Sequence, residues 1–328
     1  MSAGALMVDD ARSLFARMRG RRILVVGDLM IDEWIWGRVS RISPEAPVPV
    51  VAVTDHSFTL GGAGNVASNL RALDAEVQFV GTIGDDAFAA DIRRMFAAQN
   101  VGEDGVFSVG DRPTTRKTRV VAHNQQVVRA DWESGAPLRD ADRTRIVEYV
   151  REHAAQSDAV ILSDYAKGLL SRDVVEAASA CPLVLADPKP QNMELFRGVT
   201  CLAPNEHEAG AASGIAIVDE ASLHEAGERL RERLQCRYLV ITRGEAGMAL
   251  FGRDGERFSI PSFARKVFDV SGAGDTVIAV LSLALAAGAS IERAMQLANF
   301  AAGAVVEKLG TATASSDEIL EIVEHGHG

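Results

Sequence analysis

Six short runs of apolar residues recur along the chain, each ending in polar or turn-forming residues. The runs are continuously apolar, whereas a strand with one solvated face alternates apolar and polar positions. Continuous runs are typical of parallel strands covered on both faces. They predict buried strands at residues 21–28, 76–84, 158–165, 182–189, 199–205 and 238–244.

Stretches with helical spacing of apolar residues separate these runs. They predict helices at residues 62–73, 85–99, 139–156, 171–180, 219–234, 274–288 and 290–309, and an amphipathic helix within 6–22. Strands that alternate with helices indicate an α/β fold, with a doubly wound, mostly parallel sheet and helices on both faces.

Two regions interrupt this alternation. Residues 33–60 contain prolines and short β-prone pieces, and residues 106–131 can pair as a hairpin around His123–Gln125. Both suit a small β layer that stands off the main sheet. No linker divides the chain, so we expect one domain over residues 1–328 with a β lid built from these two insertions.

Composition narrows the function classes. The 328 residues are 47% hydrophobic and 24% charged, with a formal net charge of −11, which argues against binding to nucleic acid or to an anionic membrane. The apolar run from Thr276 to Gly288 is too short to span a bilayer and predicts a buried helix. Three dispersed cysteines without paired spacing indicate reduced thiols. We expect a soluble, cytoplasmic protein.

The stretch DVSGAGDT, Asp269–Thr276, leads into a predicted helix through two glycines. Amide groups at a helix N-terminus bind anions, and glycines let a ligand approach the backbone closely. Asp275 stands beside these amides, where it can accept a proton from a hydroxyl that attacks a phosphoryl group. Spacing alone supports a helix-capping aspartate equally well. A Walker A loop is absent from the sequence, so ATP chemistry needs a different architecture.

A second glycine-rich stretch offers a different function. Residues Gly62–Ala67 satisfy the relaxed G-x-G-x-x-G/A pattern of dinucleotide-binding folds, and Asp85 follows at a distance suited to a ribose contact. The preceding residues form a poor buried strand, and this is not the first strand–helix unit. An NAD-binding oxidoreductase is therefore a distant alternative.

The DVSGAGD stretch and residues 61–86, GGAGNVASNLRALDAEVQFVGTIGDD, resemble the two signature regions of the PfkB (ribokinase-like) family of small-molecule kinases. Further stretches are similar to family members that act on D-glycero-β-D-manno-heptose 7-phosphate in ADP-heptose biosynthesis, namely GRVSRISPEAPVPVV, NQQVVRAD, ILSDYAKG, DPK, APNEHE and VEKLGTAT. The resemblance runs from Arg22 to about Ser316. Some such members carry a fused nucleotidyltransferase domain; this chain ends soon after the kinase, so we expect the stand-alone form.

The resemblance implies a ribokinase-like fold and a role for each matching residue. Asp275 would be the catalytic base beside an anion hole of Gly272, Ala273 and Gly274. The sugar would contact Asp28, Asp32, Gly61, Gly62 and Asn65. ATP and Mg²⁺ would lie near Asn205, Glu208, Thr242, Gly244 and Asn299, with Glu208 holding the metal through water. Loop carboxylates at Asp28 and Asp32, and a helix N-cap at Asn205, are the structural alternatives.

A substrate phosphate needs cations, and arginine gives bidentate contacts. The candidates are Arg41, Arg116, Lys117, Arg119 and Lys167, and Lys189 is a candidate for the ATP phosphates. Cations at 116–119 also suit an edge strand that is protected from pairing.

The implied reaction transfers the γ-phosphoryl group of Mg·ATP to the anomeric O1 of the heptose 7-phosphate, giving the 1,7-bisphosphate, a precursor of the lipopolysaccharide core. Another PfkB kinase, acting on a free sugar, a sugar phosphate or a nucleoside, is the alternative. Assistance by K⁺, as in some relatives, stays open. The resemblance and the exposed lid edges both favour a homodimer through the lid.

Overall fold

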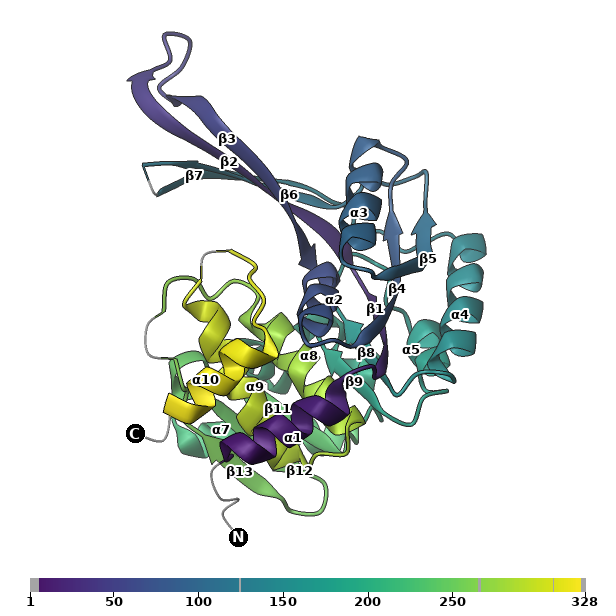
Figure 1. Cartoon of the computed structure of the whole chain (residues 1–328). Helices are drawn as coiled ribbons and strands as arrows, with labels where there is room; N and C mark the ends of the chain where they lie inside the picture. The colour runs from purple at the N-terminus through teal and green to yellow at the C-terminus, as the bar shows by residue number, and fades with distance from the viewer. Residues whose placement is uncertain (1–5, 124, 265–266, 309, 326–328) are drawn as a thin grey trace.

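A computed structural model describes residues 6–123, 125–264, 267–308 and 310–325, which form two sheets (Figure 1). The large sheet has nine strands in the order β13-β12-β11-β10-β9-β8-β1-β4-β5. Neighbouring strands pair in parallel, except for the antiparallel pairs β11–β12 and β12–β13. Its strands are β1 (Arg22–Gly27), β4 (Glu76–Ile83), β5 (Gly102–Ser108), β8 (Ala159–Ser163), β9 (Val184–Asp187), β10 (Cys201–Leu202), β11 (Tyr238–Thr242), β12 (Met248–Gly252) and β13 (Arg257–Ile260).

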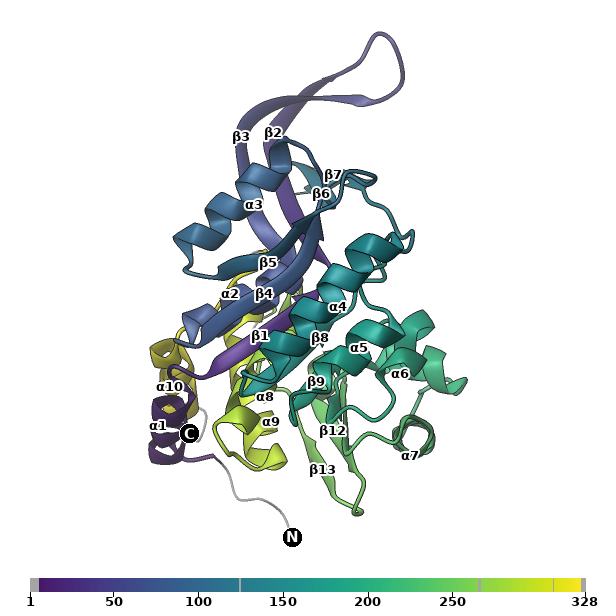
Figure 2. The same ribbon diagram turned by 90° about the vertical axis from the view of Figure 1, so that its right-hand side faces the viewer.

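Helices cover both faces of this sheet because its central strands are apolar on both sides (Figure 2). In β1, Ile23 and Val25 pack into one core, and Leu24 and Val26 pack into the other. The first core contains α1 (Val8–Met18), α2 (Ala63–Ala72), α3 (Ala87–Ala98), α8 (Ala273–Ala286), α9 (Ile291–Val306) and α10 (Ser316–His325). The second contains α4 (Asp140–Ala154), α5 (Arg172–Ala178), α6 (Glu206–Ser213) and α7 (Glu220–Leu234). The predicted doubly wound α/β fold is confirmed.

The small sheet has the strand order β3-β2-β6-β7 and stands away from the body of the molecule (Figure 1). It is built from β2 (Leu29–Ile42), β3 (Pro49–Gly62), β6 (Arg116–Ala122) and β7 (Gln125–Trp132). Its second segment begins later than predicted, because residues 106–108 belong to β5 of the large sheet. Gly62 ends β3, which pairs antiparallel with β2, so the dinucleotide interpretation of this loop lacks the parallel strand that it requires.

The apolar segment after Asp275 and the three cysteines are buried in the structure. The apolar run after Asp275 forms α8, most of whose residues are buried, as predicted for a core helix. Cys181, Cys201 and Cys236 are buried and free. Over the residues that the structure describes, none of the helices has the length and apolar character needed to cross a bilayer.

Candidate active site

The N-terminus of α8 carries the DVSGAGDT stretch. Gly272 precedes the helix with φ +79°, and a Cβ on it would lie 2.5 Å from Nδ2 of Asn65. Only glycine satisfies both constraints. Asp275 lies in the first turn of α8 and is buried. Its carboxylate accepts hydrogen bonds from two other elements: Asn65 Nδ2 donates to Oδ2 at 2.8 Å, and the Tyr165 hydroxyl donates to Oδ1 at 2.7 Å.

The surroundings of Asp275 tune its proton affinity. Burial raises the pKa of Asp275 to about 6, and the nearby carboxylate of Asp32 adds to the rise. The hydrogen bonds from Asn65 and Tyr165, and the charge of Lys189, act in the opposite direction. A carboxylate with a pKa near 6 is ionised at neutral pH and still basic enough to accept a proton from a hydroxyl as it reacts.

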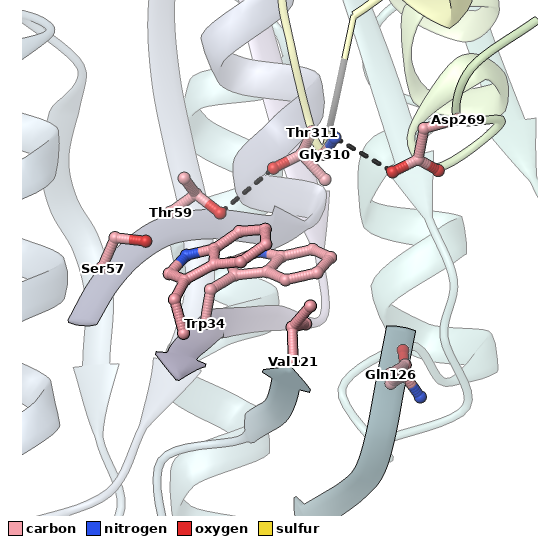
Figure 3. Close-up of a pocket in the computed structure, with 9 residues that line it drawn as sticks. Trp34, Ser57, Thr59, Val121, Gln126, Asp269, Gly310 and Thr311 are labelled. Atoms are coloured by element: carbon pink, nitrogen blue, oxygen red, sulfur yellow. Dashed lines mark hydrogen bonds between the residues drawn. The ribbon is translucent and has the colours of Figure 1, made fainter. Parts of the chain in front are cut away.

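A cavity of about 550 Å³, here called the tryptophan cavity, opens between the small sheet and the segment after α9 (Figure 3). It is lined by Trp34, Trp36, Ser57, Thr59, Val121, Gln126, Asp269, Gly310 and Thr311. The two indole rings are stacked, with centroids 5.5 Å apart. The Thr311 hydroxyl donates to Thr59 Oγ1 at 3.1 Å. Thr311 Cγ2 lies 3.6 Å from the position of a Cβ on Gly272, so the cavity adjoins the start of α8.

Asp32 and Arg119 form an ion pair beside this cavity. The guanidinium of Arg119 lies 5.0 Å from the ring centroid of Trp34, and both partners are largely buried. Gly61 makes room for the carboxylate, because a Cβ there would lie 2.3 Å from Asp32 Oδ2. The fold thus brings the predicted sugar-binding residues Asp32, Gly61 and Asn65 to the region of Asp275.

Asp28 has a different environment from Asp32. Its carboxylate accepts hydrogen bonds from the backbone amides of Tyr165 at 2.9 Å, Lys167 at 3.0 Å and Leu169 at 3.4 Å. Burial raises its pKa to about 6, and these amides oppose the rise. Asp28 therefore anchors the loop after β8. This agrees with the alternative interpretation of Asp28 as a carboxylate that stabilises a loop.

The other predicted phosphate ligands do not converge on the tryptophan cavity. Arg116 lies on the opposite face of the small sheet from Arg119, since side chains alternate along β6. There it pairs with Glu33 at 2.9 Å and lies between the rings of Phe88 and Trp132. The remaining lysines, Lys117 and Lys167, both pair with Glu133, and Arg41 is exposed near the far end of β2.

A second cavity of about 390 Å³, here called the α8–α9 pocket, is lined mainly by apolar side chains of the two helices and by the loops around β11 and β12. Four residues predicted to contact ATP line it: Asn205, Thr242, Gly244 and Asn299. Ala273 and Gly274 of the DVSGAGDT stretch line it as well. An apolar pocket with a few polar groups at one end suits a nucleobase with its phosphates.

Asn205 and Glu208 form a capping box at the start of α6, the structural alternative for this motif. Glu208 Oε2 accepts from the Asn205 amide at 2.9 Å, and Oε1 accepts from Lys189 Nζ at 2.6 Å. Among the described residues, no three His, Cys, Asp or Glu side chains are grouped to hold a metal ion. The single carboxylate of Glu208 is nevertheless compatible with Mg²⁺, which is commonly held by one carboxylate together with water and substrate phosphates.

Two residues of this region had no predicted role, Tyr165 and Asp187. Tyr165 follows β8 and Asp187 is the last residue of β9, so both lie at the edge of the sheet where ligands of α/β folds bind. Burial raises the pKa of Asp187 well above its usual value, while Lys189 opposes this shift. A carboxylate oxygen of Asp187 lies 4.0 Å from the position of a Cβ on Gly274. The sequence signal that could have identified Tyr165 and Asp187 was their place at the ends of predicted strands, in the stretches SDYAKG and DPK.

The sequence of this chain is similar to those of known carbohydrate kinases. Residues 21–318 match the model of the pfkB family carbohydrate kinases. The bifunctional protein HldE of Geobacter metallireducens is 49% identical over 316 residues, covering 95% of this chain and 64% of that protein. HldE of Geobacter sulfurreducens is 45% identical over 324 residues, covering 97% and 66%. The chain therefore spans about two thirds of the length of these curated relatives.

Solved structures with the same fold share little sequence with this chain. Arabidopsis thaliana ribokinase complexed with ribose and ATP superimposes with a TM-score of 0.75 at 22% identity, covering 93% of this chain and 99% of that one. Escherichia coli phosphofructokinase-2 in complex with substrates and products gives 0.77 at 18% identity, covering 94% and 100%. These likenesses support the fold, and the family match supports the sequence-based assignment. The chain belongs to the pfkB family of carbohydrate kinases.

Proposed function

We propose that the protein transfers the γ-phosphoryl group of Mg·ATP to the anomeric O1 of D-glycero-β-D-manno-heptose 7-phosphate, a step toward ADP-heptose and the lipopolysaccharide core. One observation carries the kinase chemistry: Asp275 lies at the start of α8, between two cavities. Ala273 and Gly274 line the α8–α9 pocket, and Gly272 adjoins Thr311 of the tryptophan cavity.

In the proposed reaction, Asp275 takes the proton from the acceptor hydroxyl as its oxygen attacks the γ-phosphorus. The new O1–phosphorus bond forms as the bond to the β-phosphate oxygen breaks, and ADP leaves. The amides of Gly272, Ala273 and Gly274 face the charge that develops on the transferred group. Lys189 supplies a positive charge to the same region, since it lowers the pKa of Asp275.

ATP is proposed to occupy the α8–α9 pocket, with its base near Asn299 and its phosphates near Thr242, Gly244, Asn205 and Lys189. Mg²⁺ would neutralise the phosphates there, held through water by Glu208. Glu208 pairs with Lys189 at 2.6 Å, which places a carboxylate and a cation together in this region.

The acceptor is proposed to lie in the tryptophan cavity beside Asp32, with its hydroxyls bonded to Asp32 and Asn65. The stacked indoles of Trp34 and Trp36 offer an apolar surface for a sugar face. Arg119, which pairs with Asp32 and lies over the ring of Trp34, is the best placed of the predicted cations for the 7-phosphate. The small sheet would cover the sugar and exclude water. Similarity of residues 37–51 and 163–168 to kinases of heptose 7-phosphate supports this acceptor.

A coupled ADP-release assay across a panel of acceptors tests this proposal. The panel contains D-glycero-D-manno-heptose 7-phosphate, mannose 6-phosphate, fructose 6-phosphate, ribose and adenosine. We expect turnover on the heptose phosphate, with kcat/KM at least about 100-fold above the others, because unpaired buried polar groups penalise analogues strongly. Preference for an unphosphorylated acceptor would contradict the heptose assignment and keep the kinase chemistry.

We also propose that the protein is a homodimer joined through the small sheet. β3 and β7 are the edge strands of that sheet, and β7 exposes Val127, Val128 and Trp132. A charge on an edge strand prevents pairing, so Val128→Lys should be monomeric by light scattering while the unchanged protein is dimeric. Val218→Lys is the matched control, since Val218 is 82% exposed and lies outside the small sheet. A monomeric unchanged protein would contradict the proposal.

A further inference from the structure

Tyr165 binds Asp275 from the loop that follows β8. Its hydroxyl donates to Oδ1 at 2.7 Å, while Asn65 donates to Oδ2 at 2.8 Å. Each oxygen of the carboxylate therefore has one donor, and the two donors come from two separate elements, α2 and the loop after β8. Such a pair fixes the plane of the carboxylate as well as its charge.

The loop that carries Tyr165 is itself held firmly. Asp28 accepts hydrogen bonds from the amides of Tyr165, Lys167 and Leu169, and Asp164 accepts from the amide of Ala166 at 2.8 Å. Ala166 has φ +56°, a left-handed conformation that is unfavourable for a residue with a side chain. Residues persist in such a conformation where their surroundings over-determine it. The four amide contacts supply that constraint.

We propose that Tyr165 is a positioning residue for the catalytic base, holding the Asp275 carboxylate oriented and ionised, and that Asp28 acts through the loop by directing Tyr165 toward it. This inference rests on the proposed function of Asp275. It gives Asp28 a part in catalysis that requires no contact with the sugar. Tyr165 keeps its proton throughout, and donates a hydrogen bond without transferring it.

Electrostatics around the pair agree with this role. Burial raises the pKa of Tyr165 well above its usual value, and the charge of Asp275 raises it further, so the phenol stays a donor at neutral pH. Three other charged groups act on Asp275 or respond to it: Lys189 lowers the pKa of Asp275, Asp32 raises it, and the charge of Asp275 raises the pKa of Asp187. Loss of the phenol hydroxyl leaves these groups in place and removes one group that favours the ionised base.

The test is the pH dependence of kcat/KM in Tyr165→Phe, which keeps the ring and removes the hydroxyl. A hydrogen bond to a charged group is worth enough to shift a pKa by about one unit. Because the lost bond favoured the ionised form, the pKa of Asp275 rises and activity is lost at a higher pH as the solution is acidified. We expect the acidic limb, near pH 6 in the unchanged protein, to move up by about one pH unit, with KM for ATP unchanged.

Tyr149→Phe is the matched control. Its hydroxyl accepts a hydrogen bond from Gln78 at 2.5 Å in the other core, so its loss should leave the pH profile as it was. A second measurement needs no substitution: the chain has three tyrosines, which can all be replaced by 3-fluorotyrosine. The fluorinated phenol is the stronger donor, so the acidic limb should move to lower pH.

The outcomes separate this inference from the proposed function. An unmoved acidic limb in both Tyr165→Phe and the fluorinated protein, with Asp275→Asn inactive, would overturn the role of Tyr165 and leave the kinase assignment intact. A uniform fall in kcat without a shift of the limb would show a packing role only and would also overturn it. Absence of turnover by the unchanged protein on every acceptor would instead contradict the proposed function.

Discussion

Replacing Asp275 with asparagine should lower kcat by about 10²–10⁴-fold, the usual contribution of a general base. The amide is nearly isosteric and keeps its place between Asn65 and Tyr165, but it cannot accept the proton of the acceptor hydroxyl. Burial raises the pKa of this carboxyl to about 6, so a neutral side chain is acceptable to the site and the fold should persist. The measurement is kcat under saturating ATP and acceptor, with a thermal melt of the same sample.

Asp317→Asn is the matched control for this change. Asp317 also lies in the first turn of a helix, α10, but it is exposed to solvent. Its substitution should leave kcat within about twofold of the unchanged value, because exposed substitutions away from special features have small effects. Near-normal turnover by a folded Asp275→Asn protein would contradict the assignment of Asp275 as the base.

Gly272→Ala should lower kcat by at least about tenfold, because its Cβ would displace Asn65 from Asp275. The new atom would lie 2.5 Å from Asn65 Nδ2, and φ at this position is +79°. Displacement of Asn65 removes one of the two donors on the carboxylate and moves the amides that we propose to face the phosphoryl group. The measurements are kcat and the free energy of unfolding in urea.

Gly288→Ala separates the effect of displacing Asn65 from the effect of the left-handed backbone conformation. Gly288 has φ +81°, and a Cβ there meets no atom within 4 Å. Both variants should therefore lose about 1–2 kcal/mol of stability from the left-handed conformation, while only Gly272→Ala loses activity. Equal kcat values in the two variants would show that close packing of Asn65 against Gly272 has no part in the reaction.

The layered fold could be predicted because its strands are buried on both faces. Runs such as Ile23–Val26 are apolar at every position, which is typical of parallel strands covered on both faces. Elements without this signature escaped prediction. β5, GEDGVFS, is an edge strand with exposed positions and two glycines, and α6 has eight residues, several of them small. Their stability depends on neighbours, which a local pattern does not contain.

The candidate site was predictable where a residue follows a strand or opens a helix. Asp275, Asn65 and Asp32 belong to such positions, and the fold brings them together. The direction in which a side chain points was harder to predict from the sequence. Arg116 and Arg119 are three residues apart on one strand and so face opposite sides, but the sequence does not say which side meets the cavity. The bond from Tyr165 to Asp275 joins residues 110 positions apart, beyond any local pattern.

The most direct test of the central claim is ³¹P NMR of the product formed from Mg·ATP and D-glycero-β-D-manno-heptose 7-phosphate. We predict a new resonance that couples to the anomeric proton, in equal amount with ADP and with the 7-phosphate resonance retained. A product phosphorylated at another hydroxyl, or ADP formed without a new sugar phosphate, would contradict transfer to O1 at the site of Asp275.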